Sequence, residues 1–261
     1  FLGCAVPEEY GGNGMGFLES VIIAEQIAKV SPSWRLPFNM QNLGPAVTVN
    51  RFGSEEQKQN YIPSWVSGEK MGFFAITEPN SGSDVVSMKT TAKDRGEHWE
   101  LNGQKTWISN ADVGDTGLVY AVTDRGKEYK GLTCFIVNSK ETAGITTKAI
   151  DTKLGLHCAP TGEIVFDGAK IPKDSVLGSV GDGFGICMWM LNNTRLGCAA
   201  GALGVAGASV DLAISYANER TQFGQPISKF QMIQAQVAEM MAEHEAAQLL
   251  VYRAAYLKDQ G

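Results

Sequence analysis

The stretch that decides the fold is Thr-Glu-Pro-Asn-Ser-Gly-Ser-Asp at residues 77–84, which directly follows the apolar run Gly72–Ile76. Its hydroxyls, proline and glycine predict a loop at the end of a strand. Such a loop exposes backbone N–H groups and short hydroxyls, which can hydrogen-bond a phosphate or the polar edge of a ring. Composition alone favours an ordinary turn, and both interpretations stay open at this point.

Short β-branched and aromatic runs separated by turns surround this loop, from Met71 to about Val176. Asn102-Gly103, between Trp99–Leu101 and Lys105–Ile108, is the strongest hairpin signal in the chain. Asp167-Gly168 marks another turn. The other predicted strands are Gly72–Ile76, Met88–Ala92, Leu118–Thr123, Leu132–Val137 and Glu163–Phe166. Because no helix separates these strands, we expect an antiparallel sandwich or barrel.

Helical patterns flank the β region on both sides. The predicted helices before it are Gly16–Lys29, a second that starts at Ser31-Pro32, and a third that opens with the capping-box pattern Ser54–Gln57 and runs to Val66. The predicted helices after it are Phe184–Arg220 and Phe230–Leu257. We therefore divide the chain into a helical segment at 1–70, a β segment at 71–178 and a helical segment at 179–261.

Composition excludes several classes of protein. Hydrophobic residues make up 44% of the 261 residues, enough for a folded core, and the net charge of −6 argues against a nucleic-acid partner. The five cysteines lack Cys-x-x-Cys spacing, which predicts free thiols in a reducing compartment, and the three histidines lack metal-ligand spacing. The most apolar stretch, Leu196–Val210, is short and rich in Ala and Gly. We therefore expect a soluble intracellular protein with no metal site and no membrane span.

Four further groups of residues are candidate sites, each with a structural alternative. Trp107–Asn110 could hold a flat heteroaromatic ring, or could be a half-buried Trp in a hairpin. Arg220–Gly224 could bind phosphate and adenine, or its Arg could complement a helix C-terminus. Arg35, in apolar company, could bind a ligand carboxylate, or could lay its stem on apolar neighbours. The Gly-x-x-Gly-x-x-Gly pattern at residues 201–207 follows no strand, so we expect tight helix packing there rather than a dinucleotide site.

Taken together and in this order, the motifs resemble those of the acyl-CoA dehydrogenase family. The resemblance spans essentially the whole chain and rests on Val6–Gly12, Ala75–Asp84, Asn102–Asn110 and Glu219–Gly224. It implies an α+β fold with a helical N-terminal part, an antiparallel β middle domain and a helical-bundle C-terminal part. It also implies an oxidoreductase that acts on a CH–CH group of an acyl-CoA, with FAD as cofactor.

The same resemblance implies partners and a location. Electrons would pass to electron-transferring flavoprotein, and the protein would be a homotetramer with FAD contacts across a subunit interface. The location would be the cytoplasm of a bacterium, or the mitochondrial matrix in a eukaryote.

The resemblance also implies roles for individual residues. The residues that would contact FAD are Phe74, Ile76, Thr77, Gly82, Ser83, Trp107, Ser109, Arg220, Phe223 and Gln231. The residues that would lie along the CoA part of the substrate are Ser83, Asn192 and Arg195. Family members usually have Thr where Ser109 stands, and the hydroxyl that would hydrogen-bond near flavin N5 is kept.

Within the family, Ser33–Gln41, Phe52–Gln57 and residues 77–84 look most like glutaryl-CoA dehydrogenases. In those enzymes the arginine that matches Arg35 binds the distal carboxylate of the substrate, and a chain without that carboxylate would leave the cation unpaired. Decarboxylating members carry a glutamate seven residues before this arginine, whereas this chain has Ala28. We therefore predict conversion of glutaryl-CoA to glutaconyl-CoA without decarboxylation.

Three alternatives stay open. They are a decarboxylating glutaryl-CoA dehydrogenase that yields crotonyl-CoA, a dehydrogenase of another dicarboxylic mono-CoA thioester such as benzylsuccinyl-CoA, and a non-catalytic scaffold of the same fold. The catalytic glutamate of the family lies beyond any residue that matches Gly261, and the family's first helices precede Phe1. We therefore expect a chain truncated at both ends and assign no catalytic base.

Overall fold

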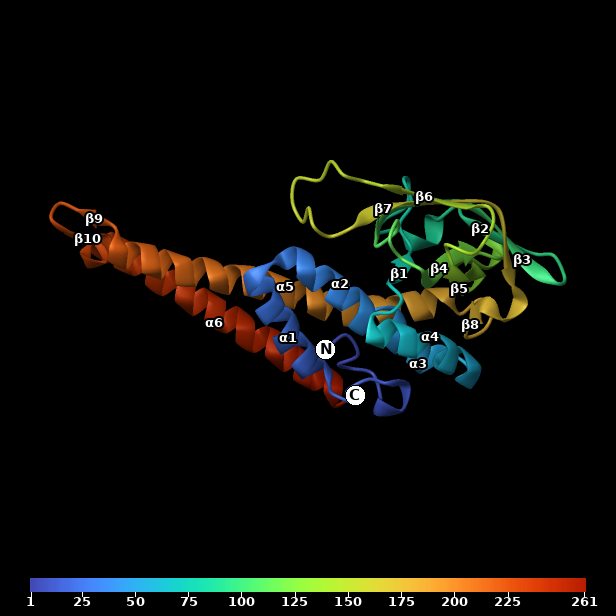
Figure 1. Cartoon of the computed structure of the whole chain (residues 1–261), viewed down its shortest axis with the longest axis horizontal. Coiled ribbons are helices and arrows are strands. Elements are labelled where there is room, and N and C mark those ends of the chain that lie inside the picture. The colour runs from blue at the N-terminus through green and yellow to red at the C-terminus, as the bar shows by residue number, and fades with distance from the viewer. The chain divides into compact units, whose positions relative to one another are not determined.

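The computed structural model of the protein describes residues 1–261. Its elements follow the predicted order of helices, sheet and helices (Figure 1). The chain forms two compact units. The first consists of Phe1–Met15 and Leu36–Thr194, and the second of Gly16–Arg35 and Arg195–Gly261. Both helical segments thus contribute residues to both units.

Three helices directly precede the sheet in the chain. They are α2 (Pro32–Asn42), α3 (Pro45–Phe52) and α4 (Glu55–Ser67). The predicted capping box of α4 forms, because Ser54 Oγ accepts from Gln57 N at 3.2 Å and Gln57 Oε1 accepts from Ser54 N at 3.1 Å. The buried Gln41 ties α2 to the sheet, since its amide oxygen accepts from Gly72 N at 2.6 Å and its Nε2 donates to Trp65 O and Lys70 O.

Eight strands form one sheet in the order β6-β7-β3-β2-β4-β5-β8, and β1 pairs with β4. The strands are β1 (Gly72–Ala75), β2 (Thr91–Asp94), β3 (His98–Ser109), β4 (Thr116–Val122), β5 (Leu132–Asn138), β6 (Ile145–Ala149), β7 (Thr161–Pro172) and β8 (Val176–Leu177). The pairs β1–β4 and β2–β4 are parallel and the other pairs are antiparallel. The predicted strand at Met88–Ala92 is displaced, because Val85–Ser87 forms a short 3-10 helix and β2 starts only at Thr91.

The predicted hairpin at Asn102-Gly103 is wrong. Both halves belong to one strand, β3, which pairs with β7 as Leu101↔Ala169 and then as Gly103↔Phe166. The two expected turns, at 102–103 and 167–168, therefore face each other across a β-bulge. Gly103 is needed there because a Cβ at its position would lie 2.6 Å from the Cα of Thr90 on the neighbouring segment. A glycine that admits a close backbone contact carries the same local sequence signal as a turn glycine.

The central strand β4 is buried along its whole length and separates two hydrophobic cores. Leu118, Tyr120 and Val122 belong to one core, which also contains residues of α3, α4 and the start of α5. Val119 and Ala121 belong to the other core, together with residues of β3 and β7. The alternation follows from the two-residue period of a strand, which sends successive side chains to opposite faces.

The second unit is built around two long helices. α5 (Gly183–Glu219) and α6 (Gln231–Asp259) agree with the predicted helices, and β9 (Thr221–Gln222) and β10 (Gln225–Pro226) form a hairpin between them (Figure 1). Helix α1 (Phe17–Val30) packs against α6. The carboxylate of Asp259 caps the start of α1 by accepting from Phe17 N at 2.7 Å, and the buried Glu25 accepts from Gln248 Nε2 and Tyr252 OH, both at 2.7 Å.

The glycines at 201–207 lie inside α5 and do not form a nucleotide-binding loop. A Cβ on Gly204 would lie 2.3 Å from the backbone oxygen of Glu25 in α1, and one on Gly207 would lie 3.0 Å from His244 Nε2 in α6. The prediction of tight helix packing through small residues is therefore confirmed, because these neighbours could not approach α5 so closely past a larger side chain.

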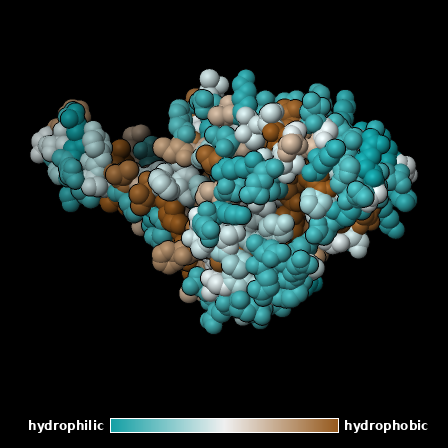
Figure 2. All heavy atoms as spheres, turned by 45° about the vertical axis from the view of Figure 1, so that its right-hand side comes forward, coloured by the Kyte–Doolittle hydropathy of each residue, from teal (hydrophilic) through white to brown (hydrophobic).

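α5 is also the one helix of residues 1–261 that is long and apolar enough to cross a membrane by length and composition. The helix extends well beyond the apolar stretch Leu196–Val210 used in the sequence prediction. Core helices of folded domains meet the same criterion, so this finding by itself does not establish a membrane span. Large apolar side chains lie exposed along α5 and α6, and Figure 2 shows part of this apolar surface in brown.

Candidate functional site

The loop at residues 77–84 closes on itself at the end of β1. Glu78 and Ser81 form an isolated antiparallel bridge, with Glu78 N donating to Ser81 O at 2.8 Å and Ser81 N donating to Glu78 O at 3.2 Å. Gly82 and Ser83 beyond this turn are exposed, and a Cβ on Gly82 would meet nothing within 4 Å. The loop therefore leaves open space at Gly82, next to the exposed Ser83, where a ligand could bind.

A buried ion pair lies beneath this loop. Lys105 is fully buried and its Nζ donates to Glu78 Oε1 at 2.9 Å and to Ile76 O at 3.0 Å. The Glu78 carboxylate also accepts the backbone N–H groups of Lys89 at 2.6 Å and Thr90 at 2.9 Å. Glu78 is therefore fully engaged inside the protein and is unavailable as a base for a substrate.

The environment shifts the pKa values of both partners downwards. Burial lowers the pKa of Lys105 to about 8, against the opposing effect of the Glu78 charge, because an ammonium loses its hydration there. Burial by itself would raise the pKa of the Glu78 carboxyl, but the Lys105 charge and the hydrogen bonds from the Thr90 and Lys89 segment lower it below its ordinary value.

A second β-bulge presents Trp107. The β3–β7 register runs from Lys105↔Ile164 to Ile108↔Gly162, so two residues of β3, Thr106 and Trp107, face one residue of β7. Trp107 has a φ of 59° and the residue is 60% exposed. A bulky residue with positive φ is held by its surroundings, which is typical of functional sites.

The same bulge joins the two motifs in space. Thr106, displaced from the regular ladder, donates its N–H to Thr77 O at 2.9 Å. The structure therefore brings the predicted residues Phe74, Ile76, Thr77, Gly82, Ser83, Trp107 and Ser109 to one region at the end of β1. An exposed indole beside backbone polar groups suits a flat heteroaromatic ligand. Asn192 lies exposed on α5, outside this group.

Three predicted residues meet at the hairpin of the second unit. Arg220 precedes β9 and its carbonyl accepts from Ile227 N at 2.8 Å, Phe223 lies in the turn, and Gln231 begins α6. Phe223 is 93% exposed and has a φ of 52°. The sequence analysis did not predict this hairpin, although Phe223-Gly224 supplies the two successive positive φ values that such a turn needs. Arg195 is exposed on α5, apart from these three.

Arg35 and Ala28 lie against the same face of α5. Arg35 is 92% buried, since only 8% of its surface is exposed, and its Nε has no hydrogen-bond partner in the structure. A Cβ on Gly201 would lie 2.7 Å from this Nε, and a Cβ on Gly204 would lie 2.7 Å from the Cβ of Ala28. Because Gly201 and Gly204 are one turn apart on one helix face, the side chains at positions 28 and 35 lie close to one another.

This contact predicts the effect of a methyl group at position 201. Gly201→Ala is expected to push the Arg35 guanidinium away and to raise the dissociation constant of a carboxylate-bearing ligand at this arginine about tenfold, equivalent to about 1.4 kcal/mol. The thermal stability should change little, because alanine favours the helix by about 1 kcal/mol and offsets part of the strain. Gly155→Ala is the control, since a Cβ there also meets nothing within 4 Å and the residue is in none of the candidate sites. Equal affinities of the two variants would contradict the contact.

Comparison with known proteins decides the family. The N-terminal, middle and C-terminal domain models of acyl-CoA dehydrogenases match residues 1–69, 73–169 and 181–261. The chain belongs to the acyl-CoA dehydrogenase family. Members are FAD flavoproteins that oxidise a CH–CH bond of an acyl-CoA, so the predicted family, fold class, enzyme class and cofactor are confirmed.

Several relatives are closely similar. The glutaryl-CoA dehydrogenase of Desulfococcus multivorans is 49% identical over 263 residues, which cover 100% of this chain and 67% of the relative. The human mitochondrial short-chain specific acyl-CoA dehydrogenase is 42% identical over 97% of this chain and 61% of the relative. The structure of a glutaryl-CoA dehydrogenase–glutaryl-CoA complex superposes with a TM-score of 0.98 at 49% identity, covering 100% of this chain and 66% of the other. The chain thus spans about two thirds of the length of these relatives.

This acyl-CoA dehydrogenase chain also has a pocket that the sequence analysis missed. It has a volume of about 530 Å³ in the first unit. Its walls include two pairs of aromatic rings. The ring centroids of Phe52 and Trp189 are 5.4 Å apart, and those of Tyr129 and Phe184 are 4.8 Å apart. The side chains of Arg51 and Lys130 also line it. The only sequence signal was that each cation adjoins an aromatic residue, as Arg51-Phe52 and Tyr129-Lys130, which is too common to interpret alone.

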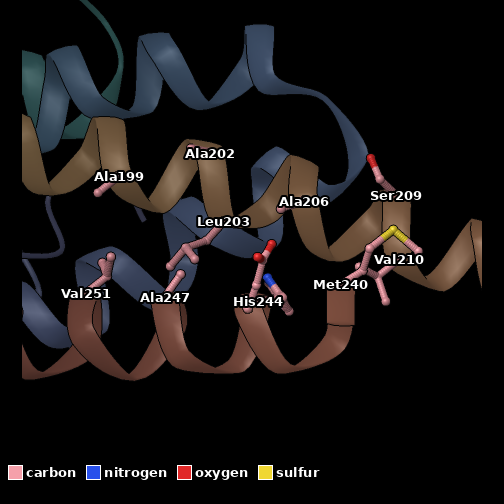
Figure 3. A pocket seen from close by; sticks show the side chains of 11 residues that line it. Ala199, Ala202, Leu203, Ala206, Ser209, Val210, Met240, His244, Ala247 and Val251 are labelled. Atoms are coloured by element: carbon pink, nitrogen blue, oxygen red, sulfur yellow. The ribbon is translucent and has the colours of Figure 1, made fainter. Parts of the chain in front are cut away.

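A different cavity lies between α5 and α6 and has a volume of about 540 Å³. Small and apolar side chains such as Ala202, Leu203 and Val251 dominate its lining, and His244 points toward it (Figure 3). None of the predicted site residues lines it. Because convergent polar groups are what orient a substrate, the loop and the bulge of the first unit are the better candidate for the cofactor site.

Proposed function

We propose that this chain holds the flavin and selects the acyl chain in an acyl-CoA dehydrogenase that converts glutaryl-CoA to glutaconyl-CoA. The substrate assignment is supported by Arg35, a buried arginine whose Nε has no hydrogen-bond partner. In this proposal the segments 1–70, 71–178 and 179–261 are the N-terminal, middle and C-terminal domains. The complete reaction is proposed for the whole protein, because the chain spans about two thirds of the length of the relatives it matches.

The residues present fit FAD. The exposed Trp107 offers a flat apolar face for the isoalloxazine, and Phe74, Ile76 and Thr77 at the end of β1 are close to it in the fold. The open space at Gly82 and the Ser83 hydroxyl suit a pyrophosphate, and the half-buried Ser109 is proposed to donate a hydrogen bond near flavin N5.

A second group of residues is proposed to reach FAD of a neighbouring subunit. Arg220, Phe223 and Gln231 cluster at an exposed hairpin, and Phe223 is almost fully exposed. An aromatic ring with so little cover favours a contact outside its own chain. The homotetramer, with FAD contacts across a subunit interface, remains part of this proposal.

When bound, FAD would supply the redox chemistry, as the acceptor for the hydride of the acyl β-carbon. The residues of this chain orient the two reactants and exclude water around the reacting carbons. A carboxylate must take the α-proton, and Glu78 does not fit that role because Lys105 and two backbone N–H groups engage it. We assign the base to no residue of 1–261.

The CoA part of the substrate has candidate contacts in the first unit. Ser83 and Asn192 are proposed to lie along it, with Arg195 on the continuation of α5. The pocket lined by Phe184 and Trp189, with Arg51 and Lys130 at its walls, suits an adenine ring and phosphates. We propose that it takes the nucleotide end of CoA.

The acyl end is selected by charge. A glutaryl chain ends in a carboxylate that can form charge-assisted hydrogen bonds with the Arg35 guanidinium, whereas a butyryl chain would leave that buried cation unpaired. Benzylsuccinyl-CoA also carries a carboxylate, so only a substrate comparison separates the two dicarboxylic substrates.

The full-length protein tests this proposal directly. The purified protein should show the visible absorbance of bound flavin, and glutaryl-CoA should bleach it. We expect kcat/KM for glutaryl-CoA to exceed that for butyryl-CoA by about 10²-fold or more. A colourless protein would instead support a non-catalytic scaffold, and faster bleaching by benzylsuccinyl-CoA would reassign the substrate.

The product should be glutaconyl-CoA. The family resemblance implies a glutamate in decarboxylating enzymes where this chain has Ala28, and a Cβ on Gly204 would lie 2.7 Å from the Ala28 Cβ. Without that second carboxylate, Arg35 holds the substrate carboxylate as a simple ion pair, which stabilises the carboxylate against loss as CO2. Chromatography of the CoA esters after one turnover checks this. Crotonyl-CoA together with CO2 would contradict it.

The partner and the location follow the same family. We propose electron-transferring flavoprotein as the electron acceptor. The relatives include enzymes of bacteria and of mammalian mitochondria. We therefore propose the cytoplasm of a bacterium, or the mitochondrial matrix in a eukaryote, as the location.

A further inference from the structure

The buried pair Glu78–Lys105 uses every donor of its lysine. The Nζ of Lys105 donates to Glu78 Oε1 at 2.9 Å, to Ile76 O at 3.0 Å and to Met88 Sδ at 3.6 Å. An ammonium has three N–H bonds, so a carboxylate, a backbone carbonyl and a thioether together satisfy it. This lysine therefore has one defined position inside the protein.

That position fixes two segments at once. On the loop side, Lys105 Nζ donates to the carbonyl of Ile76 and to the carboxylate of Glu78. Thr106 N donates to the carbonyl of Thr77, the residue between these two. On the strand side, Lys105 is the last regularly paired residue before the bulge that presents Trp107. The distance between Thr77 and Trp107 is therefore set through Lys105.

Stability alone does not account for this arrangement. Removing two charges from water costs about as much as their attraction returns, so apolar side chains of similar size often serve a core as well or better. A buried pair of this kind can instead select one conformation among several. The conformation selected here is that of the loop and the bulge where the flavin is proposed to bind.

We propose that Glu78 and Lys105 are positioning residues that set the geometry of the flavin site, although neither can touch the flavin. Lys105 is fully buried and the Glu78 side chain is 5% exposed, so they act through Ile76, Thr77 and the Trp107 bulge. This inference rests on the proposed FAD site, and it adds two residues that hold that site in shape.

The test is a neutral replacement of the pair in the full-length protein. Glu78→Gln with Lys105→Met removes both charges, keeps one acceptor oxygen for the Lys89 or the Thr90 N–H, and leaves an apolar stem of similar length. The matched control is Glu100→Gln with Arg95→Met, which removes an ion pair of the same 2.9 Å length whose side chains are 24% and 46% exposed. FAD dissociation constants, flavin spectra and midpoint potentials are measured beside the thermal unfolding of the FAD-free protein.

We expect the buried double variant to unfold within a few degrees of the wild type, while its FAD dissociation constant rises at least tenfold and the flavin bands change shape. The control should match the wild type in every readout. A folded double variant with wild-type FAD affinity and spectrum would overturn the inference.

If the double variant does not fold, Met88→Leu decides, because it removes only the thioether acceptor and conserves volume. We expect a two- to fivefold weaker FAD affinity for this variant, and an unchanged affinity would overturn the inference. A wild-type protein that binds no FAD would overturn the proposed function and this inference together, whereas a wild type that binds FAD separates the two.

Discussion

Arg35→Gln is expected to lower kcat/KM for glutaryl-CoA about 10²-fold or more, while kcat/KM for butyryl-CoA stays within about threefold. Truncating one partner of a buried charged pair costs about 2–5 kcal/mol, and each 1.4 kcal/mol is a factor of ten. Butyryl-CoA has no distal carboxylate, so it loses no ion pair when the cation is removed. Steady-state kinetics with both substrates on the full-length protein measures the difference.

Lys29→Gln is the control for this experiment. Lys29 lies beside the same glycine stripe of α5, near Gly207, and its Nζ is 3.8 Å from Asp211. Removing this second cation from the same helix face should leave the ratio of the two substrates unchanged. If Arg35→Gln slowed both substrates equally, the loss would be one of folding, and the carboxylate assignment would fail.

Lys105→Met alone is expected to lower the free energy of unfolding by about 3–5 kcal/mol at pH 7. Removing one partner of a buried ion pair leaves the other without compensation, here the carboxylate of Glu78. Adding Glu78→Gln should restore much of the loss, since no unpaired charge then remains. Denaturant unfolding of the FAD-free single and double variants measures both effects. A single variant as stable as the double would contradict the buried pair.

The pH dependence of stability has a defined sign. The pKa of Lys105 in the folded protein is about 8, below its ordinary value of 10.5, so the unfolded chain binds more protons in the interval between them. This group therefore adds stability as pH rises from about 8 towards 10.5. Lys105→Met should lack this rise, which unfolding curves measured at pH 7.5 and 9.5 can detect as a difference from the wild type.

Several local features were predictable because short-range interactions decide them. The capping box of Ser54 needs only Gln57 three residues away, and α6 needs only an apolar stripe at helical spacing. The long helix α5 was also predicted within one residue at each end. The Phe223-Gly224 hairpin is equally local, and it was missed because two short strands of two residues each carry too little pattern.

The errors arose where a distant segment decided the outcome. Asn102-Gly103 carries a hairpin signature, but Gly103 is needed because Thr90 approaches it closely. The twelve residues of β3 continue as one strand because β7 pairs with most of them, on both sides of each bulge. Likewise, Lys105 stands in a strand pattern with nothing to mark it as buried and paired with Glu78, 27 residues earlier. Contacts at such separations leave no local pattern to interpret.

The sequence by itself determined the family and the flavin, because the loop at 77–84, the Trp107 strand end and the Arg220 turn each carry side chains that the chemistry needs, in a defined order. Only the tertiary structure decided how these motifs are held. In the folded protein, Thr106 leaves the regular strand pairing and its N–H donates to Thr77 O. Lys105 is buried beneath the loop. The fold also places Ala28 and Arg35 against one stripe of glycines on α5. The physical reason is that burial and close backbone approach depend on contacts between segments far apart in the chain. A local sequence pattern does not predict such contacts.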